Sequence, residues 1–403
     1  MLQIGLVGKP NAGKSTFFSA ATLVDVKIAP YPFTTIEANK GVGYVKIKCV
    51  CSEFNVQDNP VNSKCIRGFR FIPVEIIDVA GLVPDAWKGR GLGNRFLDEL
   101  RRADVLIHVV DASGGTDEEG RKLRPGQHDP LKDVAFLEKE VDMWIFQILK
   151  KDWNTLIKKA TILGSELSRI LAERLSGLGV KLGHIQQALS ESGLEDIKKA
   201  RDAGDEKILF FVKLLRQYSK PILIAANKCD IPQSEDNIKI MMKELKGKYI
   251  VIPTSSISEL VLRKAAKAGL IEYLPGESDF KILDEKKLSR KQIDALEYVR
   301  ENVLKKWGST GVQESLNRAV FDILETVVVF PVENEYKLTD HHGRVLPDAF
   351  LVPPGTTAKE FAGLIHSDLQ KKFMHAVDAR TKRKLPANYV LKHKDVIKIV
   401  TRR

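Results

Sequence analysis

The stretch from Ile4 to Thr16 constrains the fold of this chain more than any other. It contains the pattern Gly-x-x-x-x-Gly-Lys-Ser, which begins at Gly8 and ends at Ser15. Residues 2–7 are mostly apolar and typical of a buried strand, and residues compatible with a helix follow the pattern. A glycine-rich turn between a strand and a helix lets backbone N–H groups surround a phosphate chain, because side chains would block that approach. The pattern therefore predicts a phosphate-binding loop in a fold of strands and helices.

Each residue type in this loop has an expected role. Lys14 would reach the terminal phosphates of a nucleotide, and the Ser15 hydroxyl would bind Mg²⁺. The residues expected to contact the nucleotide here are Gly8, Lys9, Pro10, Asn11, Ala12, Gly13, Lys14, Ser15 and Thr16.

A second phosphate motif follows a second apolar strand, predicted over residues 71–77. The strand ends at Asp78-Val79-Ala80-Gly81, a D-x-x-G sequence. An Asp at a strand tip can hold Mg²⁺ through water, and the N–H of Gly81 can meet a γ-phosphate. The sequence therefore predicts a metal ligand at Asp78 and a catalytic phosphate contact at Gly81.

Residues 29–41, between the two motifs, contain two prolines and a pair of threonines. This composition predicts an extended loop rather than a helix. Within it, Thr35 could supply a hydroxyl to Mg²⁺ and sense the terminal phosphate with its backbone N–H. We therefore expect Lys14, Thr35 and Gly81 to be catalytic, and Ser15, Thr35 and Asp78 to hold Mg²⁺.

A third motif points to the base of the nucleotide. The predicted strand 221–226 is followed by Asn227-Lys228-Cys229-Asp230. The Asp230 carboxylate can accept hydrogen bonds from N1–H and the exocyclic N2–H₂ of guanine, a donor pair that adenine lacks. Asn227 would tie this loop to the phosphate loop, and the stem of Lys228 would lie on the base. Ser255 and Ser256 follow the predicted strand 249–252, where their backbone could meet the guanine carbonyl.

The pattern of apolar residues divides the chain into parts. Residues 1–128 and 220–275 carry the motifs and should form two halves of one nucleotide-binding domain. Residues 129–219 have apolar side chains at helical spacing without strand-like alternation, so they predict a helical insertion. Residues 276–326 predict a connector whose two amphipathic helices span residues 289–304 and 311–328.

Residues 327–403 differ in composition and predict a small α+β unit. Val327 to Val332 are strand-like, and Thr357 with Glu360 forms a capping box at the start of a helix. The unit is basic through Lys371, Lys372, Arg380, Lys382, Arg383, Lys384, Lys392, Lys394, Arg402 and Arg403.

Charge and cysteine usage narrow the possible partners and compartment. A net charge of +12 and a pI near 9.3 favour a polyanionic partner, most plausibly RNA. No apolar run reaches the length of a membrane span, and the chain starts in a strand rather than a signal peptide. Four cysteines in 403 residues favour a reducing cytosol, so we expect a cytoplasmic protein.

Three of the cysteines lie close in sequence, at Cys49, Cys51 and Cys65. They lack a fourth ligand at the usual spacing of a zinc site. A structural zinc stays open as an alternative, but the sequence favours spare thiols.

Together these motifs resemble those of the Obg family of GTPases, in its YchF-like branch with a C-terminal TGS domain. The residues that carry the resemblance are Gly8-Lys-Pro-Asn-Ala-Gly-Lys-Ser15, Tyr31-Pro-Phe-Thr-Thr35, Asp78-Val-Ala-Gly-Leu-Val83, Gly91-Leu-Gly-Asn94, Asn227-Lys-Cys-Asp230, Leu346-Pro-Asp348, Pro354-Gly355-Thr356 and Ile365-His366. The resemblance implies a P-loop NTPase fold with a mostly parallel sheet flanked by helices, a helical hairpin insertion and a C-terminal β-grasp (TGS) domain. It also implies association with ribosomes or RNA.

The chain departs from the YchF-like pattern at the base motif. Proteins of that branch have a degenerate fourth motif and favour ATP, whereas Asn227, Lys228 and Asp230 are all present here. We therefore expect a monomeric, Mg²⁺-dependent GTPase that binds GTP and GDP. It would act as a molecular switch in translation or in other processes that involve ribosomes or RNA. Two alternatives stay open: an ATPase of the YchF type, and a nucleotide-gated RNA-binding or scaffold protein with incidental hydrolysis.

One residue that assists hydrolysis in Ras-like enzymes is missing. There a Gln after D-x-x-G orients the attacking water, but this position is Leu82 here, followed by Val83. We therefore expect slow intrinsic turnover, helped by a monovalent cation or by an activator in trans. Asn11 could ligate K⁺ with its side-chain oxygen, or it could brace the loop by hydrogen bonds.

Overall fold

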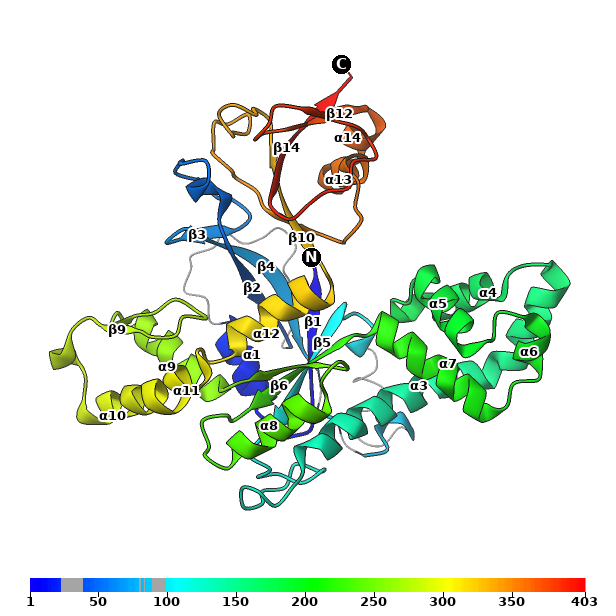
Figure 1. Ribbon diagram of the computed structural model, residues 1–403, viewed down its shortest axis with the longest axis horizontal. Helices are drawn as coiled ribbons and strands as arrows, with labels where there is room; N and C mark the ends of the chain where they lie inside the picture. Colours follow the sequence, from blue (N-terminus) through cyan, green and yellow to red (C-terminus); the bar gives the residue numbers. More distant parts are fainter. Residues whose placement is uncertain (23–38, 80, 83, 89–98, 403) are drawn as a thin grey trace.

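The computed structural model describes residues 1–22, 39–79, 81–82, 84–88 and 99–402. A central sheet, a helical insertion on one side and a separate C-terminal unit form the molecule (Figure 1). Among the described residues, no helix combines the length and the hydropathy that crossing a membrane requires.

The central sheet contains seven strands in the order β2-β4-β1-β5-β6-β7, with β3 paired to the edge of β4. Strands β4, β1, β5, β6 and β7 run parallel, whereas β2 and β3 pair with β4 in the antiparallel direction. Their bounds are β1 Gln3–Val7, β2 Lys40–Lys48, β3 Lys64–Ile66, β4 Phe69–Asp78, β5 Val105–Asp111, β6 Ile222–Asn227 and β7 Ile250–Pro253. Strands β5 and β6 are buried along their whole length, as expected for a parallel sheet covered on both faces. The predicted mostly parallel α/β fold is confirmed.

The prediction for the start of this sheet was partly wrong. Lys40 and Gly41, expected in an extended loop, are the first residues of β2. Strand β2 pairs with β4 at nine positions. This pairing stabilises the strand and outweighs the local signals for a loop at its start. Residues 23–38 lie outside the described part of the chain, and with them most of the predicted loop.

Helices cover both faces of the sheet. Helix α1 (Lys14–Thr22) packs against α9 (Ser256–Lys267), and α8 (Ser234–Glu244) lies beside β7. Arg263 of α9 donates hydrogen bonds to the carbonyl oxygens of Ala20 (2.6 Å) and Ala21 (3.3 Å). This buried guanidinium satisfies carbonyl groups in the last turn of α1, which would otherwise lack partners.

The segment 129–219 contains five helices and stands off one side of the sheet (Figure 1). Their bounds are α3 Pro130–Leu163, α4 Leu167–Leu175, α5 Leu182–Ser192, α6 Ile197–Arg201 and α7 Asp205–Ser219. Asp129 caps α3 by accepting a hydrogen bond from the N–H of Leu131, and Gly164 ends it in the left-handed conformation. Helix α3 is the longest, with 34 residues, and it extends from beneath the sheet into the insertion.

The segment 271–323, which includes most of the predicted connector, contains a short hairpin and a chain of helices. Its elements are β8 Ile271–Glu272, β9 Lys281–Ile282, α10 Arg290–Val299, a π-helical turn Arg300–Leu304, α11 Lys305–Trp307, α12 Val312–Arg318 and a second π-helical turn Ala319–Ile323. The second predicted helix was too long at its C-terminal end, because Glu325 has a positive φ of 49° and redirects the chain. The β-branched residues from Val327 onward then enter a strand instead.

The C-terminal unit is a five-stranded sheet in the order β11-β10-β14-β12-β13, with α13 packed on it. Its elements are β10 Val327–Val332, β11 Phe350–Val352, α13 Ala358–Ile365, α14 Ser367–Lys371, β12 Phe373–Asp378, β13 Lys384–Leu385 and β14 Asp395–Thr401. The capping box is present, since Thr357 accepts from the N–H of Glu360 while the Glu360 side chain accepts from the N–H of Thr357. The central parallel pair β10–β14 and the crossing helix confirm the predicted β-grasp arrangement.

Single-turn 3₁₀ helices complete the described elements. They are Val50–Ser52, Ala86–Lys88, Ser176–Leu178 and Glu285–Lys287.

Candidate nucleotide-binding site

The phosphate loop joins β1 to α1 at the carboxyl edge of the parallel strands, where ligands of such sheets bind. Gly8 (φ 145°) and Gly13 (φ 99°) have backbone angles that L side chains rarely adopt. A Cβ on Gly8 would collide with the carbonyl oxygen of Val109, and one on Gly13 would collide with the Asn227 side chain. Conformation and space therefore both require glycine at these positions.

Lys14 lies at the mouth of the loop beside the D-x-x-G motif. Its Nζ donates to the carbonyl oxygen of Lys9 (3.1 Å), and a Cβ on Gly81 would lie 3.4 Å from the same nitrogen. Burial lowers the pKa of Lys14, and the nearby Asp78 carboxylate opposes that shift. The structure therefore brings together Lys14 and the backbone of Gly81, as a contact to one terminal phosphate would require.

Ser15 and Asp78 form the candidate metal site. Ser15 Oγ donates to Asp78 Oδ2 (3.2 Å), while Asp78 Oδ1 is buried without a hydrogen-bond partner. Burial raises the pKa of Asp78, and Lys14 and the Ser15 hydroxyl lower it. An unpartnered carboxylate oxygen beside a hydroxyl suits a hard cation, so these residues fit Mg²⁺. Thr35, the other predicted ligand, lies outside the described residues.

Asn227 connects the base loop to the phosphate loop. Its Nδ2 donates to the carbonyl oxygen of Ala12 (2.8 Å), and its Oδ1 accepts from the N–H (3.1 Å) and the hydroxyl (2.9 Å) of Ser256. All three residues are buried. The predicted link between the two loops is therefore present, and it extends to the first turn of α9.

Asp230 is held in place from two sides. Ser255 Oγ donates to Asp230 Oδ1 (2.7 Å), and the Tyr298 hydroxyl donates to the Asp230 carbonyl oxygen (2.9 Å). Ser255 is itself buried and caps α9 by accepting from the N–H of Ser258. The side chain of Ser255 thus acts on Asp230, whereas the sequence suggested a backbone contact to the base.

Lys228 has a charged partner that sequence reasoning missed. Its Nζ lies 2.7 Å from Asp111 Oδ2, and its backbone is left-handed with φ 66°. Asp111 is fully buried at the end of β5 and also accepts from Ser113 and Thr116. An acidic residue at the carboxyl end of a buried strand was the available signal for this role. The ion pair fixes the lysine stem that was expected to lie on the base.

The side chains of two residues of the phosphate loop contact the segment 116–133. Lys9 is 2% exposed, and its Nζ lies 2.8 Å from an Asp133 carboxylate oxygen and donates to the Thr116 carbonyl oxygen (2.7 Å). Asn11 Nδ2 donates to the carbonyl oxygen of Gly120 (2.9 Å). The bracing contact considered for Asn11 is therefore present, and any contact of Lys9 with a nucleotide would come from its backbone.

The remaining predicted residues of the loop occupy ordinary places in it. Pro10 packs next to Gly81, Ala12 is buried, and Thr16 is half-buried in the first turn of α1. Leu82, in the position of the missing Gln, is 1% exposed and its N–H donates to the Gly8 carbonyl oxygen (3.2 Å). A buried leucine cannot hold a water, which agrees with the expectation of slow intrinsic turnover.

The chain beyond D-x-x-G is tied to the helical insertion. The N–H groups of Asp85 (2.9 Å) and Trp87 (3.1 Å) donate to the two carboxylate oxygens of Glu140, a buried residue of α3. Near its start the same helix carries Asp133, which pairs with Lys9 of the phosphate loop. Helix α3 thus contacts the phosphate loop and the segment that follows D-x-x-G.

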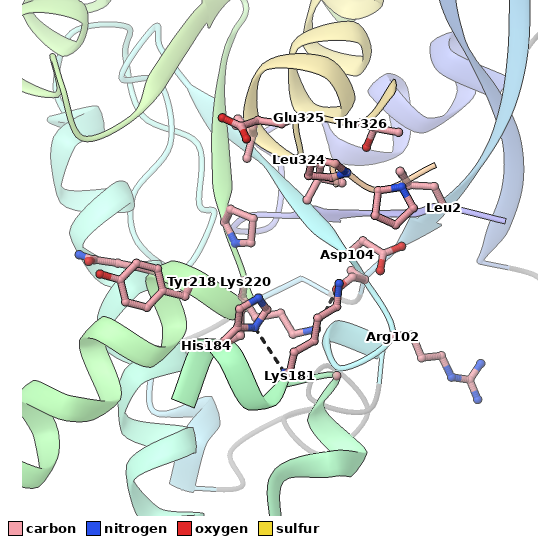
Figure 2. A pocket seen from close by; sticks show the side chains of 18 of the residues that line it. Leu2, Arg102, Asp104, Lys181, His184, Tyr218, Lys220, Leu324, Glu325 and Thr326 are labelled. Atoms are coloured by element: carbon pink, nitrogen blue, oxygen red, sulfur yellow. Dashed lines mark hydrogen bonds between the residues drawn. The ribbon is translucent and has the colours of Figure 1, made fainter. Parts of the chain in front are cut away.

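A second hollow, of 590 Å³, lies at the opposite edge of the sheet (Figure 2). Leu2, Asp104 and Pro221, which line it, directly precede β1, β5 and β6. Lys220 also lines it; its Nζ donates to the carbonyl oxygens of Arg101 (2.9 Å) and Ala103 (2.7 Å), and burial lowers its pKa to about 8. No glycine-rich loop borders this hollow, so the nucleotide site is assigned to the carboxyl edge.

Comparison with known protein families gives three matches along the chain. Residues 3–148 match the family described as 50S ribosome-binding GTPase, and residues 342–401 match the TGS domain. Residues 225–334 match the family described as Obg-like GTPase YGR210-like, G4 motif-containing domain.

Similar proteins cover nearly the whole chain. An uncharacterized GTP-binding protein of Methanocaldococcus jannaschii is 50% identical over 401 residues, which cover 100% of this chain and 99% of the relative. Another from Schizosaccharomyces pombe is 38% identical, covering 90% of this chain and 89% of its own. A ribosome-binding ATPase YchF of Bacillus subtilis is 28% identical, covering 93% and 87%.

Solved structures share the architecture. The crystal structure of a GTP binding protein from Pyrococcus horikoshii OT3 is 41% identical, with a TM-score of 0.80 and complete coverage of both chains. The YchF GTPase of Schizosaccharomyces pombe has the same fold at 20% identity, with a TM-score of 0.59 and coverage of 99% and 97%.

The position of Asp230 predicts the choice of base. Asp230→Asn should weaken GTP binding more than tenfold, because a charge-assisted pair of hydrogen bonds is lost. Xanthosine triphosphate should bind the variant better than the wild type, since its O2 accepts where guanine donates. Calorimetric titration of GTP, GDP and ATP into nucleotide-free protein measures this, with the exposed Asp236→Asn as the matched control. Wild-type protein that binds ATP as tightly as GTP would show the guanine assignment to be wrong.

The phosphate contacts predict separable effects on hydrolysis and folding. Lys14→Ala or Ser15→Ala should abolish Mg²⁺-dependent hydrolysis, because Lys14 acts on phosphate and Ser15 on the metal. Circular dichroism should show an unchanged fold, and Ser19→Ala on the same helix should retain activity. Turnover at the wild-type rate in either loop variant would contradict the assignment of this site.

Proposed function

Because the chain belongs to the Obg-like family of GTPases, in the YchF-like branch that carries a TGS domain, we propose that it is a Mg²⁺-dependent switch on ribosomes or RNA. It is a GTP hydrolase. The observation that carries the proposal is a basic, exposed surface on the same molecule as a phosphate loop and a base loop that are joined by Asn227.

The chemistry follows from the contacts of the phosphate loop. Lys14 would neutralise charge on the terminal phosphates, and the backbone N–H of Gly81 would contact the γ-phosphate beside it. Ser15 and Asp78 would hold Mg²⁺, which neutralises phosphate charge during transfer. No side chain at Leu82 positions the water, so these residues alone support slow turnover.

Release of the γ-phosphate would change contacts outside the nucleotide site. Gly81 would lose its phosphate contact, and the residues that follow it are bonded to Glu140 of α3. A switch of this kind needs a segment that differs between the triphosphate and diphosphate states. Among the described residues, Gly81, Asp85 and Trp87 belong to the part of the chain that would meet this need.

The surface that would bind ribosomes or RNA is the basic surface of the C-terminal unit. Seven of the basic residues named for this unit are exposed: Lys371, Lys372, Lys382, Arg383, Lys384, Lys392 and Arg402. The acidic side chains nearby are engaged within the unit, since Asp378 accepts from Thr381 and Glu335 pairs with Lys398. The unit therefore presents excess positive charge, which suits the phosphate backbone of RNA.

Charge reversal tests the docking. Arg383→Glu with Lys384→Glu should weaken ribosome binding at least fivefold and flatten its salt dependence, because counterion release scales with the phosphates neutralised. Co-sedimentation with ribosomes over a salt series, with GDP or a non-hydrolysable GTP analogue, measures both effects. The matched control is Lys151→Glu with Lys158→Glu, two exposed residues of α3.

Two results would redirect the proposal. Equal loss of binding in the control would mean that only net charge matters, which contradicts docking by the C-terminal unit. Binding that is the same with GDP and with the GTP analogue would favour the alternative of an RNA-binding scaffold with incidental hydrolysis.

Asn11 supports a test for a monovalent cation. Its Nδ2 is fixed on the Gly120 carbonyl oxygen, which leaves Oδ1 as the atom for K⁺. We expect faster turnover in K⁺ than in Na⁺ at matched ionic strength, and no difference in Asn11→Ala. Equal rates in both salts for the wild type would contradict a role for K⁺. An activator in trans would then be the remaining source of positive charge at the phosphates.

A further inference from the structure

Three cysteines and one aspartate meet between the central sheet and the C-terminal unit. Cys49 and Cys51 follow β2, Cys65 lies in β3, and Asp58 lies in the loop between them. One ligand atom from each residue lies within 4.8 Å of all the others. Cys51 Sγ is 3.7 Å from Cys65 Sγ, and Cys49 Sγ donates to Asp58 Oδ2 (3.2 Å).

We propose that Cys49, Cys51, Cys65 and Asp58 bind one Zn²⁺ as a structural site. A zinc–sulfur bond of about 2.3 Å in a tetrahedron places two sulfur ligands about 3.8 Å apart, close to the separation seen here. The sulfur atoms of a disulfide would be only about 2.05 Å apart. Four protein donors close the coordination sphere, so the site has no open position for a substrate.

The donor set selects the kind of metal. Three soft thiolates favour Zn²⁺, and Mg²⁺ or Ca²⁺ would require oxygen ligands instead. The cluster is separate from the Mg²⁺ site, whose residues Ser15 and Asp78 are a hydroxyl and a carboxylate.

Zinc binding would change the protonation of the cluster. The thiolate is the form of cysteine that binds a metal, so the three thiol protons would be released to solvent when the ion binds.

Arg70 orients the fourth donor. This residue is 0% exposed, and it donates to Asp58 Oδ2, to Ser63 Oγ and to the carbonyl oxygen of Leu346, each over 2.9 Å. A hydrogen bond that fixes a ligating carboxylate is the usual support of a metal site. Leu346 belongs to the C-terminal unit, so the same side chain links the cluster to that unit.

The loop between β2 and β3, which holds the cluster, also contacts the C-terminal unit. The N–H groups of Asn59 and Val61 donate to the carbonyl oxygens of Val345 (2.8 Å) and Pro347 (2.7 Å). Glu53 of the same loop accepts from Arg380 at 2.6 and 2.9 Å. A zinc ion would connect the two ends of this loop and so fix the surface on which the C-terminal unit docks.

The sequence spacing of the cysteines explains why the sequence favoured thiols that bind no metal. No cysteine or histidine stands near Cys65 at a usual zinc spacing, and Asp58 belongs to no pattern with Cys51. Only the folded loop brings Asp58 next to the three cysteines, where Arg70 holds its carboxylate.

Metal content of the full-length protein tests the proposal. After purification under reducing conditions and dialysis, elemental analysis should give about one zinc per chain, since the site holds a single ion. Cys65→Ser should lower this content at least tenfold, while Cys229→Ser, which changes the remaining cysteine, should retain it. Asp58→Ala should weaken zinc binding while leaving the thiolate ligands in place.

Cobalt spectroscopy keeps the test independent of whether a variant folds. Wild-type protein loaded with Co²⁺ should show thiolate-to-metal charge transfer and the ligand-field bands of a tetrahedral site. Removal of zinc with a chelator should increase hydrogen exchange at residues 345–349, because the docking loop would lose its cross-link. This increase separates a structural metal from an adventitious one.

Three results would overturn the proposal. The first is wild-type protein without bound zinc that also gives no tetrahedral cobalt spectrum. The second is zinc lost equally from the Cys65→Ser and Cys229→Ser variants. The third is an intact mass, measured without added reductant on protein alkylated at lysis, that lacks two hydrogens and that peptide mapping assigns to a Cys51–Cys65 disulfide.

Discussion

The close approach of Asn227 to the phosphate loop is the contact on which the rest of the nucleotide site depends. One amide joins Ala12 of the loop between β1 and α1, the end of β6, and Ser256 at the start of α9. There is no space for a side chain at Gly13, because its Cβ would occupy the position of the amide nitrogen. Phosphate recognition and base recognition are therefore fixed relative to each other by a single buried side chain. The parallel sheet makes this possible by aligning the carboxyl ends of β1 and β6 at one edge.

Buried charge organises the surroundings of this contact. Lys9, Lys14 and Lys228 lie near Asp133, Asp78 and Asp111 respectively, each acid coming from a distant part of the chain. Removing one partner of a buried pair leaves an uncompensated charge, which costs about 3–5 kcal/mol. The pairs therefore specify which segments must assemble around the phosphate loop. Lys14 differs from Lys9 and Lys228 in its expected role, because its ammonium group lies at the mouth of the loop, where it would contact phosphate.

The sequence predicted the parts whose signals are local. The glycine pattern, the two strand-end motifs and the capping box at Thr357 depend on neighbouring residues, and they appear where expected. The pairing of Lys9 with Asp133 could not be predicted, because the two residues are distant in sequence and Asp133 belongs to no motif. Asp111 stands out as an acidic residue at a strand end, but nothing in the sequence indicates that it pairs with the distant Lys228. Strand β2 was missed since its pairing with β4 outweighs weak local propensity. The second connector helix was extended too far because the left-handed turn at Glu325 has no signal in composition.

Helix α3 has a mechanical consequence. Its 34 residues span about 50 Å at 1.5 Å per residue, and it is held near one end by Asp133 and Glu140. The other end lies in the insertion, on one side of the sheet (Figure 1). Such a rod acts as a lever: a tilt of about five degrees at the held end displaces the far end by about 4 Å over this length. Rearrangements of less than a bond length around a phosphate would thus become movements of side-chain size at the far end of the insertion.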